Sequence, residues 1–304
     1  MLRRTLLYLS GRSWLRRWME ESSLSRRFTS RFIAGRSLQE GIRVLQRLSK
    51  ERIFGTLDFL GENVTSLQDA GRSRDSYLAA LSEIERAALP ATISIKLTQL
   101  GLDFSQAACH ANVTALVERA QAIGSRVEID MESSSYTGRT LEMVYSLQES
   151  FPEHVRAVIQ AYLYRSEADI RMLCTQKIPV RLCKGAYGEP PTVAFPRKSE
   201  VDDNYVRLMK LLLVEGTYPA IASHDEAILR AAVRHIKEHN LAADRFEFQM
   251  LFGIRRDLQR ELVSQGFPLR LYVPYGDAWY PYFMRRLAER PANLLFLAKN
   301  LVRS

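Results

Sequence analysis

The sequence predicts a (β/α)8 barrel of the TIM type, an α/β fold, with a helical arm before it. From about residue 56 onward, short β-rich runs alternate with amphipathic helical runs through eight strand–helix units. No G-x-G-x-x-G follows any of these strands, which counts against an open doubly wound sheet, the second architecture considered. A chain of 304 residues with 46% hydrophobic content can form one such domain. We therefore expect an arm over residues 1–55 and a catalytic barrel over residues 56–304.

Strands are indicated by runs rich in β-branched and aromatic residues. In chain order the eight runs are TLDFL (56–60), TISIKL (92–97), RVEIDM (126–131), VRAVIQAYL (155–163), PVRLCKGA (179–186), AIASH (220–224), FEFQML (246–251) and LRLYVPY (269–275).

Helices are indicated between these runs by apolar residues that recur at helical spacing. The clearest patterns span residues 77–89, 112–124, 204–216, 226–239 and 255–266. Three of them end at Gly124, Gly216 and Gly266, and glycine is the residue favoured just after a helix.

The N-terminal arm concentrates positive charge. Residues 1–36 contain nine arginines and two glutamates, and so carry most of the net charge of +9. Trp14 and Trp18 lie one helical turn apart among these arginines. Such a segment can lie on an anionic membrane surface, or pack on its own domain or on a second subunit, and the sequence leaves these alternatives open. Its Arg/Ser-rich start also resembles a transit peptide.

The remaining composition limits the partners and the compartment. Beyond residue 36 the chain is nearly neutral, so we expect no nucleic-acid groove. Cys109, Cys174 and Cys183 show neither metal spacing nor an even disulfide framework, which indicates reduced thiols and a cytoplasmic protein. No run approaches the roughly 18–20 apolar residues that a membrane span needs.

Polar residues mark the predicted strands near their carboxyl ends, where barrels of this kind place the active site. They are Lys96, Asp130, Gln160, Arg181, Lys184, His224, Gln249, Tyr272 and Tyr275. A buried lysine or arginine costs several kcal/mol unless an opposite charge neutralises it. We therefore expect the pocket to hold an anion.

The segment YPYFMRRLAER (280–290) follows the last strand. On a helix, Tyr282 lies on the face of Arg285 and Arg286, with Glu289 one turn further on. Two interpretations stay open from the spacing alone: an exposed helix with local Arg–Glu pairs, or a two-arginine clamp for a carboxylate or phosphate.

A metal-dependent hydrolase or isomerase is the alternative function. Its candidate ligands are Asp130, Glu132, His224, Asp225 and Glu247. However, we expect no helix or strand to present two imidazoles together, because His235 and His239 fall on a polar helix face. No motif for an activated serine or cysteine nucleophile is present either. We therefore expect no metal.

Eight blocks of sequence, one for each predicted strand, resemble the proline dehydrogenases over roughly residues 37–300. They are LDFLGE (57–62), SIKLTQLG (94–101), IDME (129–132), QAYLYRS (160–166), RLCKGAY (181–187), IASHDE (221–226), EFQMLFGIRRDLQ (247–259) and YVPYGDAWYPYFMRRLAERPAN (272–293). No aldehyde dehydrogenase domain follows, so the chain is most similar to the monofunctional bacterial type.

This resemblance implies a flavoenzyme that catalyses the first step of proline catabolism. In that family an FAD-binding, distorted (β/α)8 barrel oxidises L-proline to Δ1-pyrroline-5-carboxylate by hydride transfer from proline C5 to flavin N5. The electrons pass to a membrane quinone. The location implied is cytoplasmic, with the inner face of the membrane as a site of peripheral contact.

The resemblance also implies roles for particular residues. Lys96, Arg285 and Arg286 would bind the proline carboxylate, and Tyr272, Tyr282 and Leu251 would pack against the pyrrolidine ring. Asp130 and Arg181 would be the catalytic pair beside the flavin, and Glu62 would close over the site as an ion-pair gate. The positions that would contact FAD are Met131, Gln160, Arg181, Lys184, Gly185, Ala186, Ser223, His224, Gln249 and Glu289.

Overall fold

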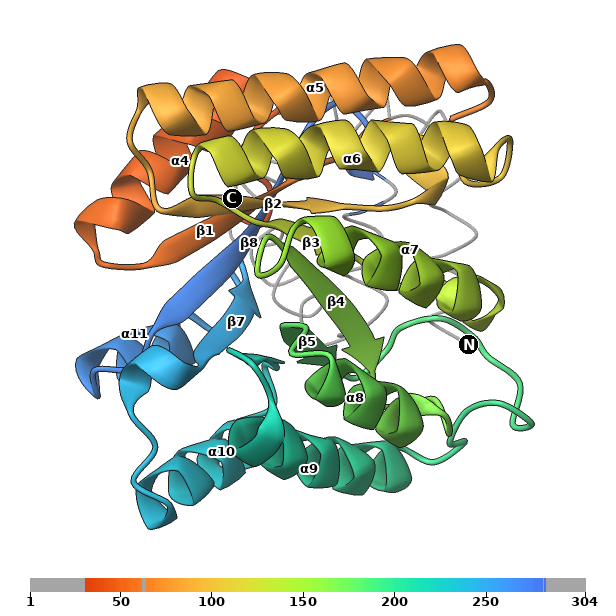
Figure 1. The fold of residues 1–304 in the computed structure, drawn as a ribbon. Helices are drawn as coiled ribbons and strands as arrows, with labels where there is room; N and C mark the ends of the chain where they lie inside the picture. Colours follow the sequence, from red (N-terminus) through yellow and green to blue (C-terminus); the bar gives the residue numbers. More distant parts are fainter. Residues whose placement is uncertain (1–30, 62–63, 281, 283–304) are drawn as a thin grey trace, which may run out of the picture.

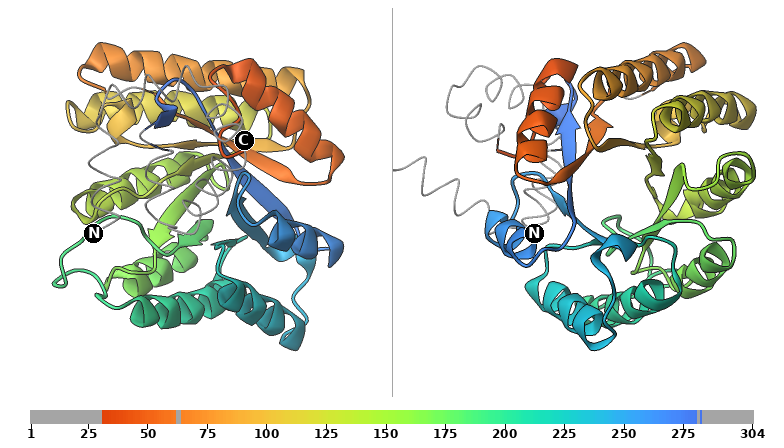
Figure 2. Two further views of the ribbon diagram at one scale, coloured as in Figure 1. Left: turned by 180° about the vertical axis from the view of Figure 1, so that it is seen from behind. Right: turned by 60° about the vertical axis from the view of Figure 1, so that its left-hand side comes forward.

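The computed structural model describes residues 31–61, 64–280 and 282, and within them the strands form a closed parallel barrel. Each strand pairs in parallel with the next, and β1 closes the barrel against β8, where Gly55 lies opposite Leu271. Helices surround the strands, as Figure 1 shows from the side, and the right-hand view of Figure 2 shows them as an outer ring. The predicted barrel is therefore confirmed over the doubly wound alternative.

The strands lie close to the predicted ranges. Their bounds are β1 (Phe54–Phe59), β2 (Ala91–Ile95), β3 (Val127–Ile129), β4 (Val155–Gln160), β5 (Val180–Cys183), β6 (Ala220–Ala222), β7 (Glu247–Leu251) and β8 (Leu269–Tyr275). Several predicted strands run too far at the carboxyl end. Lys96, Asp130 and Lys184 follow their strands, and His224 follows β6, so these side chains extend from loops.

The described helices include one before β1 and one or more after each of the first seven strands. The α-helices are α4 (Leu38–Lys50), α5 (Leu67–Arg86), α6 (Gln106–Ala122), α7 (Thr137–Ser150), α8 (Ser166–Thr175), α9 (Lys198–Glu215), α10 (Glu226–Glu238) and α11 (Arg256–Ser264). Short 3-10 turns cover η1 (Thr98–Leu100), η2 (Ser134–Tyr136) and η3 (Ala243–Arg245).

Helix α4 packs on the barrel where β1 and β8 meet. Its first turn is fixed by Ser37, whose hydroxyl accepts from the Glu40 amide, while the Glu40 carboxylate accepts from the Ser37 amide. Its buried side chains Leu45 and Leu48 belong to the same apolar core as the strands. The division into an arm and a barrel stays a prediction, because residues 1–30 lie outside the described part.

Helix ends show where glycine is needed. Gly124 and Gly266 adopt φ of 65° and 82°, the left-handed conformation expected after a helix. At Gly216 this expectation is wrong, because the residue is extended, with φ −79° and ψ 154°. A Cβ there would lie 2.5 Å from the Leu212 carbonyl oxygen, so close packing against the helix end accounts for that glycine instead.

Two further expectations concern thiols and membranes. Cys109, Cys174 and Cys183 are free cysteines. In the described part of the chain, no helix combines the length and apolar character required to span a bilayer.

Candidate active site

The interior of the barrel is polar along much of its length, whereas the sequence predicts polar residues near the carboxyl ends of the strands. Polar side chains recur at every second residue of several strands, the spacing that places them on one face. These buried or half-buried residues are Thr56 and Asp58, Thr92 and Ser94, Glu128 followed by Asp130, Glu247 and Gln249, and Arg270 and Tyr272.

Asp130 is the centre of a polar cluster at the carboxyl ends of the strands. Its Oδ1 accepts from the Ser94 hydroxyl at 2.9 Å and from the Arg181 guanidinium. Its Oδ2 accepts from the Tyr272 hydroxyl at 2.7 Å and from Lys96 Nζ at 3.2 Å. The predicted catalytic pair and two predicted substrate residues therefore meet at one carboxylate.

Lys96 lies between two carboxylates. Its Nζ is 3.0 Å from Asp58 Oδ1, and its side chain keeps 30% exposure while Asp58 is buried. Burial has the largest effect on Lys96 and lowers its pKa, but Asp58 and Asp130 outweigh it, so the pKa lies above the ordinary value. Lys96 is therefore a permanent cation with a partly exposed ammonium group.

Burial and neighbouring charges also act in opposite directions on the pKa of Asp130. Burial, the largest effect, opposes ionisation, but Arg181 and then Lys96 lower its pKa below the ordinary range. The pKa of Tyr272 lies well above its ordinary value, first because of burial and then because of Asp130. At neutral pH the cluster thus contains an ionised carboxylate and a neutral phenol that donates to it.

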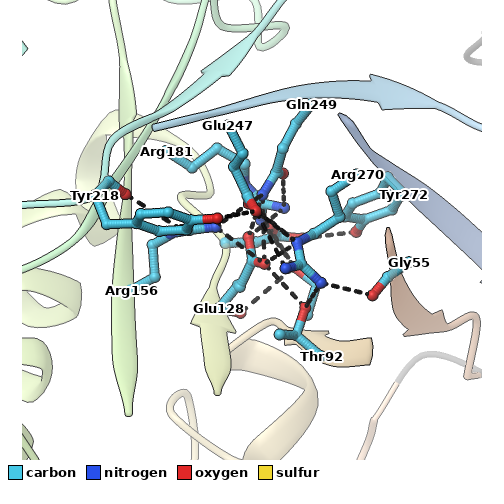
Figure 3. A network of polar contacts seen from close by, with 12 residues as sticks. Gly55, Thr92, Glu128, Arg156, Arg181, Tyr218, Glu247, Gln249, Arg270 and Tyr272 are labelled. Atoms are coloured by element: carbon cyan, nitrogen blue, oxygen red, sulfur yellow. Dashed lines mark hydrogen bonds and ion pairs between the residues drawn. The ribbon is translucent and has the colours of Figure 1, made fainter. Parts of the chain in front are cut away.

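A second, fully buried ion network lies deeper in the barrel (Figure 3). Arg156 Nη1 contacts Glu247 Oε1 at 2.5 Å and Glu128 Oε1 at 3.4 Å, and all three side chains have 0% exposure. Arg270 binds Glu247 through Nε at 3.0 Å and Nη2 at 3.1 Å, and it donates to the Gly55 carbonyl oxygen at 2.9 Å. Burial acts first to raise the pKa of Glu247, but Arg270 and Arg156 lower it far below the ordinary value.

Arg181 and Gln249 connect the cluster around Asp130 with the deeper ion network. Arg181 Nη1 lies 3.0 Å from Glu128 Oε2 in the deep network, and its Nη2 contacts Asp130 above. Gln249 accepts from Arg181 at 3.1 Å through Oε1 and donates to Glu128 at 3.1 Å and Glu247 at 2.7 Å through Nε2. Both ends of the Gln249 amide are therefore in use within the protein.

The charges of this network cancel internally. Four carboxylates face four cations: Asp58, Glu128, Asp130 and Glu247 against Lys96, Arg156, Arg181 and Arg270. The buried cations that suggested a bound anion are thus already neutralised. An excess of positive charge for an anionic ligand would have to come from elsewhere, such as Arg285 and Arg286.

Among the positions predicted to contact FAD, Gln160 and Met131 lie together. Gln160 is 3% exposed, and its Nε2 donates to the Met131 carbonyl oxygen at 3.3 Å. Its Oε1 is buried without a hydrogen-bond partner in the described structure. Leu251 donates its amide at 2.7 Å to His224 Nε2, which ties the loop after β6 to the end of β7.

Lys184 is held by acids rather than directed at open space. Its Nζ contacts Asp225 at 2.9 Å and also Asp202 of α9. Asp225 caps α10 by accepting from the Ala227 amide at 3.1 Å, and the Ser223 hydroxyl accepts from the Asp225 amide at 3.1 Å. The loops after β5 and β6 are therefore joined by one ion cluster.

Gly185 adopts φ of 102°, and a Cβ there would lie 2.2 Å from the Tyr162 ring. This contact alone requires glycine at the position. The neighbouring Ala186 is exposed at the same loop.

The candidate metal ligands do not converge. Within the part of the chain that the structure describes, the group of side chains able to hold a metal is His235, Glu238 and His239, on the last turn and cap of α10. Asp130 and Glu247 are ion-paired as above. Glu132, whose pKa burial raises, accepts from the Thr98 amide at 3.1 Å and hydroxyl at 2.7 Å. This geometry does not favour the metal-dependent alternative.

Tyr282, which is predicted to pack against the substrate ring, is buried, with 6% exposure. Arg285, Arg286, Glu289 and Glu62 lie outside the described residues.

Several charged residues of the site were missed by sequence reasoning. Asp58, Glu128, Arg156 and Arg270 all lie inside the barrel within 8% exposure. The sequence contains a signal that could have found two of them. Glu128 precedes Asp130 by two residues and Arg270 precedes Tyr272 by two, and residues two apart in a strand share a face.

Comparison with known proteins identifies the family. The family model described as proline dehydrogenase matches residues 42–299. Proline dehydrogenase 1 of Bacillus subtilis subsp. natto is 38% identical over 303 residues, which cover 100% of both chains. Proline dehydrogenase of Deinococcus radiodurans is 38% identical over 277 residues, 90% of this chain and 89% of that protein.

Solved structures agree in fold. Proline utilization A (PutA) of Bdellovibrio bacteriovorus matches with a TM-score of 0.80 and 28% identity, over 86% of this chain and 32% of that one. A substituted PutA of Bradyrhizobium japonicum matches with a TM-score of 0.74 and 26% identity, over 86% of this chain and 31% of that one. The chain thus spans about a third of the length of these PutA proteins. By its whole-length similarity to curated relatives, the chain belongs to the proline dehydrogenase family, oxidoreductases that oxidise proline as the first step of its catabolism.

Proposed function

We propose that this protein oxidises L-proline to Δ1-pyrroline-5-carboxylate with FAD and passes the electrons to a quinone. The observation that carries the proposal is the cluster of Lys96, Asp130, Arg181 and Tyr272 at the carboxyl ends of the strands, in a chain that belongs to this family. Active sites of barrel enzymes lie at this end.

The cluster supplies contacts suited to proline, a small carboxylate with an apolar ring. The partly exposed ammonium group of Lys96 is proposed to donate to the substrate carboxylate, together with Arg285 and Arg286. Because Asp58 and Asp130 already neutralise Lys96, the two arginines would supply the net positive charge. Tyr272, Tyr282 and Leu251 would pack against the pyrrolidine ring. Glu62 is proposed to pair with one of the arginines and close the site.

One buried polar atom supports a flavin at this position. The buried Gln160 Oε1 lacks a donor within the described structure, and a ligand N–H or hydroxyl would satisfy it. We propose that Met131, Gln160, Arg181, Lys184, Gly185, Ala186, Ser223, His224 and Glu289 hold FAD, which when bound accepts the hydride from proline C5 at N5. Gln249 is proposed to act through Arg181, since both ends of its amide are already bonded.

The protein's own groups orient the reactants instead of transferring protons. Asp130 stays ionised because its pKa is lowered, so it positions Lys96, Arg181 and Tyr272 and does not act as a proton donor. Arg181 is a permanent cation, held between Asp130 and Glu128, that can stabilise negative charge developing beside it. Proline has to react with its ring nitrogen neutral, because the nitrogen lone pair forms the C=N bond, so the proton of the ring ammonium group passes to water before the hydride leaves. Its carboxylate is therefore the group to which the cations should bind.

A visible spectrum tests cofactor and substrate together. The purified protein should show flavin absorbance bands, and anaerobic addition of L-proline should bleach them. A colourless protein, or flavin bands that L-proline leaves unchanged, would contradict the proposal.

The arginine clamp is tested by kinetics. Arg285→Met and Arg286→Met should each raise KM for proline about tenfold or more, since a hydrogen bond to a charged group contributes about 1.5–3 kcal/mol. Arg290→Met, in the same segment, is the matched control. An unchanged KM in both clamp variants would rule out the clamp.

A quinone resides in a membrane, so electron transfer to it requires the protein to contact a bilayer. We propose that the basic residues 1–36 contact an anionic bilayer. Liposomes of anionic lipid should co-float the full chain but not a chain lacking residues 1–36. Failure of the full chain to co-float would refute the membrane contact while leaving proline oxidation untouched.

A further inference from the structure

A second cluster of ligand-bearing side chains lies on α10, which packs beside α9 on the outside of the barrel (Figure 1). His235 and Glu238 belong to the last turn of α10, and His239 is its C-cap. One ligand atom from each of the three lies within 4.8 Å of the others, and the two imidazole centroids are 4.0 Å apart. The expectation that no helix presents two imidazoles together is therefore wrong, because a spacing of four residues brings both rings to one face.

The hydrogen bonding of the two imidazoles is compatible with binding a cation. His239 Nδ1 lies 2.9 Å from the His235 carbonyl oxygen. A carbonyl only accepts, so Nδ1 donates this bond, which in the neutral tautomer leaves the lone pair on Nε2, the orientation usual for metal-binding histidines. His235 is 7% exposed, and its Nε2 has no hydrogen-bond partner within the described residues. A buried polar atom without a partner is unusual, and a bound cation would provide one.

The charged groups around His235 oppose each other. Lys210 of α9 disfavours a cation there, whereas Glu238 contributes a negative charge and a ligand oxygen.

We propose that His235, Glu238 and His239 form a site for a divalent transition-metal ion such as Zn²⁺, Co²⁺ or Ni²⁺, with water completing the coordination. Imidazole and carboxylate ligands suit these ions. Bonds of about 2.0–2.1 Å in tetrahedral geometry place ligand atoms about 3.4 Å apart. The exposed Glu238 side chain can rotate toward the two rings without breaking the bond from His239 Nδ1 to the His235 carbonyl oxygen.

The location assigns the metal a structural role. The end of α10 leads through η3 into the start of β7, which is the barrel face opposite the carboxyl ends of the strands. Residues at that face of a barrel contribute to stability, while catalysis takes place at the other. A bound ion would clamp the last turn of α10 and leave proline oxidation unchanged.

Titration of the EDTA-treated, full-length protein with CoCl₂ tests the site. We expect saturable binding of one ion per chain by calorimetry, and a cobalt spectrum without a thiolate charge-transfer band. His239→Ala and Glu238→Gln should each weaken binding about tenfold or more. His110→Ala, which removes an exposed histidine of α6, should bind as the wild type does.

Thermal unfolding provides the second readout. ZnCl₂ should raise the Tm of the wild type and of His110→Ala, but not that of His239→Ala, because an ion that binds only the folded state stabilises it. Proline oxidation should be equal in the wild type and His239→Ala, with or without the metal. Equal cobalt affinity in the wild type and His239→Ala, or a thiolate band, would overturn the proposal.

Discussion

Replacing Arg156 by methionine tests how the buried ion network stabilises the barrel. Arg156 bonds Glu247, Glu128 and, at 3.3 Å, the Tyr218 carbonyl oxygen, and its side chain is fully buried. Methionine fills much of the volume without the charge. The substitution leaves two buried carboxylates with one cation fewer, and breaking a buried ion pair in this way costs about 3–5 kcal/mol.

The network partly limits this loss. Glu247 keeps Arg270 at 3.0 Å, and Glu128 keeps Arg181 at 3.0 Å, so neither carboxylate becomes wholly unpaired. We therefore expect a loss near the lower end of that range, about 3 kcal/mol. Against a typical free energy of unfolding of about 5–15 kcal/mol, this loss is large. Urea denaturation followed by circular dichroism should show a lower midpoint with an unchanged slope.

Two further variants test whether the loss of stability comes from the buried charge: a control at an exposed ion pair and a double variant in the network. Arg171→Met is the matched control, because Arg171 forms an exposed pair with Glu167 at 2.9 Å, and such pairs contribute about 0–1 kcal/mol. In the double variant Arg156→Met, Glu128→Met the surplus carboxylate is absent, while Arg181 keeps Asp130 and Arg270 keeps Glu247, so stability should recover in part. If Arg156→Met lost no more stability than Arg171→Met, the buried network would not stabilise the fold as argued.

Three other outcomes are expected. The difference in free energy of unfolding between the wild type and Arg156→Met should narrow below about pH 4.5 in denaturation curves. The reason is that Glu128 and Glu247 have lowered pKa values in the folded state, so the stability they contribute is present above the unfolded-state pKa and is lost as they protonate. A constant difference down to acid pH would contradict this. Tyr272→Phe removes the 2.7 Å hydrogen bond to Asp130, so kcat/KM for proline should fall about tenfold or more at unchanged flavin content; an unaltered kcat/KM would argue against the cluster. Gly185→Ala should lower the flavin content seen in the visible spectrum, whereas Gly188→Ala, with nothing within 4 Å of the added methyl group, should not; equal flavin content in both would show that the Gly185 loop does not support the cofactor.

The sequence predicts the barrel well because runs rich in β-branched and aromatic residues alternate along the chain with helical patterns, and each of these runs forms a strand. It is less reliable at strand ends. Lys96 and Asp130 continue the alternating pattern of polar residues one position past the ends of β2 and β3, so pattern alone extends those strands too far. The polar cluster around Asp130 could be predicted in part, since the carboxyl ends of the strands of a barrel meet at one face.

The deep network could not be predicted in the same way. Arg156 and Glu247 are 91 residues apart and lie on β4 and β7, which are not neighbours in the sheet. Their contact depends on closure of the barrel, which local pattern does not encode. The same applies to Lys184, whose pairing with Asp202 depends on how α9 packs.

The most direct test of the account is anaerobic titration of flavin-containing Lys96→Met with L-proline. Proline is proposed to lie against the partly exposed ammonium group of Lys96, so bleaching of this variant should require about tenfold or more proline than the wild type. Lys50→Met, which alters an exposed lysine of α4, should bleach at the wild-type concentration. If folded Lys96→Met bleached at the same proline concentration as the wild type, the cluster at the carboxyl ends of the strands would not be the proline site.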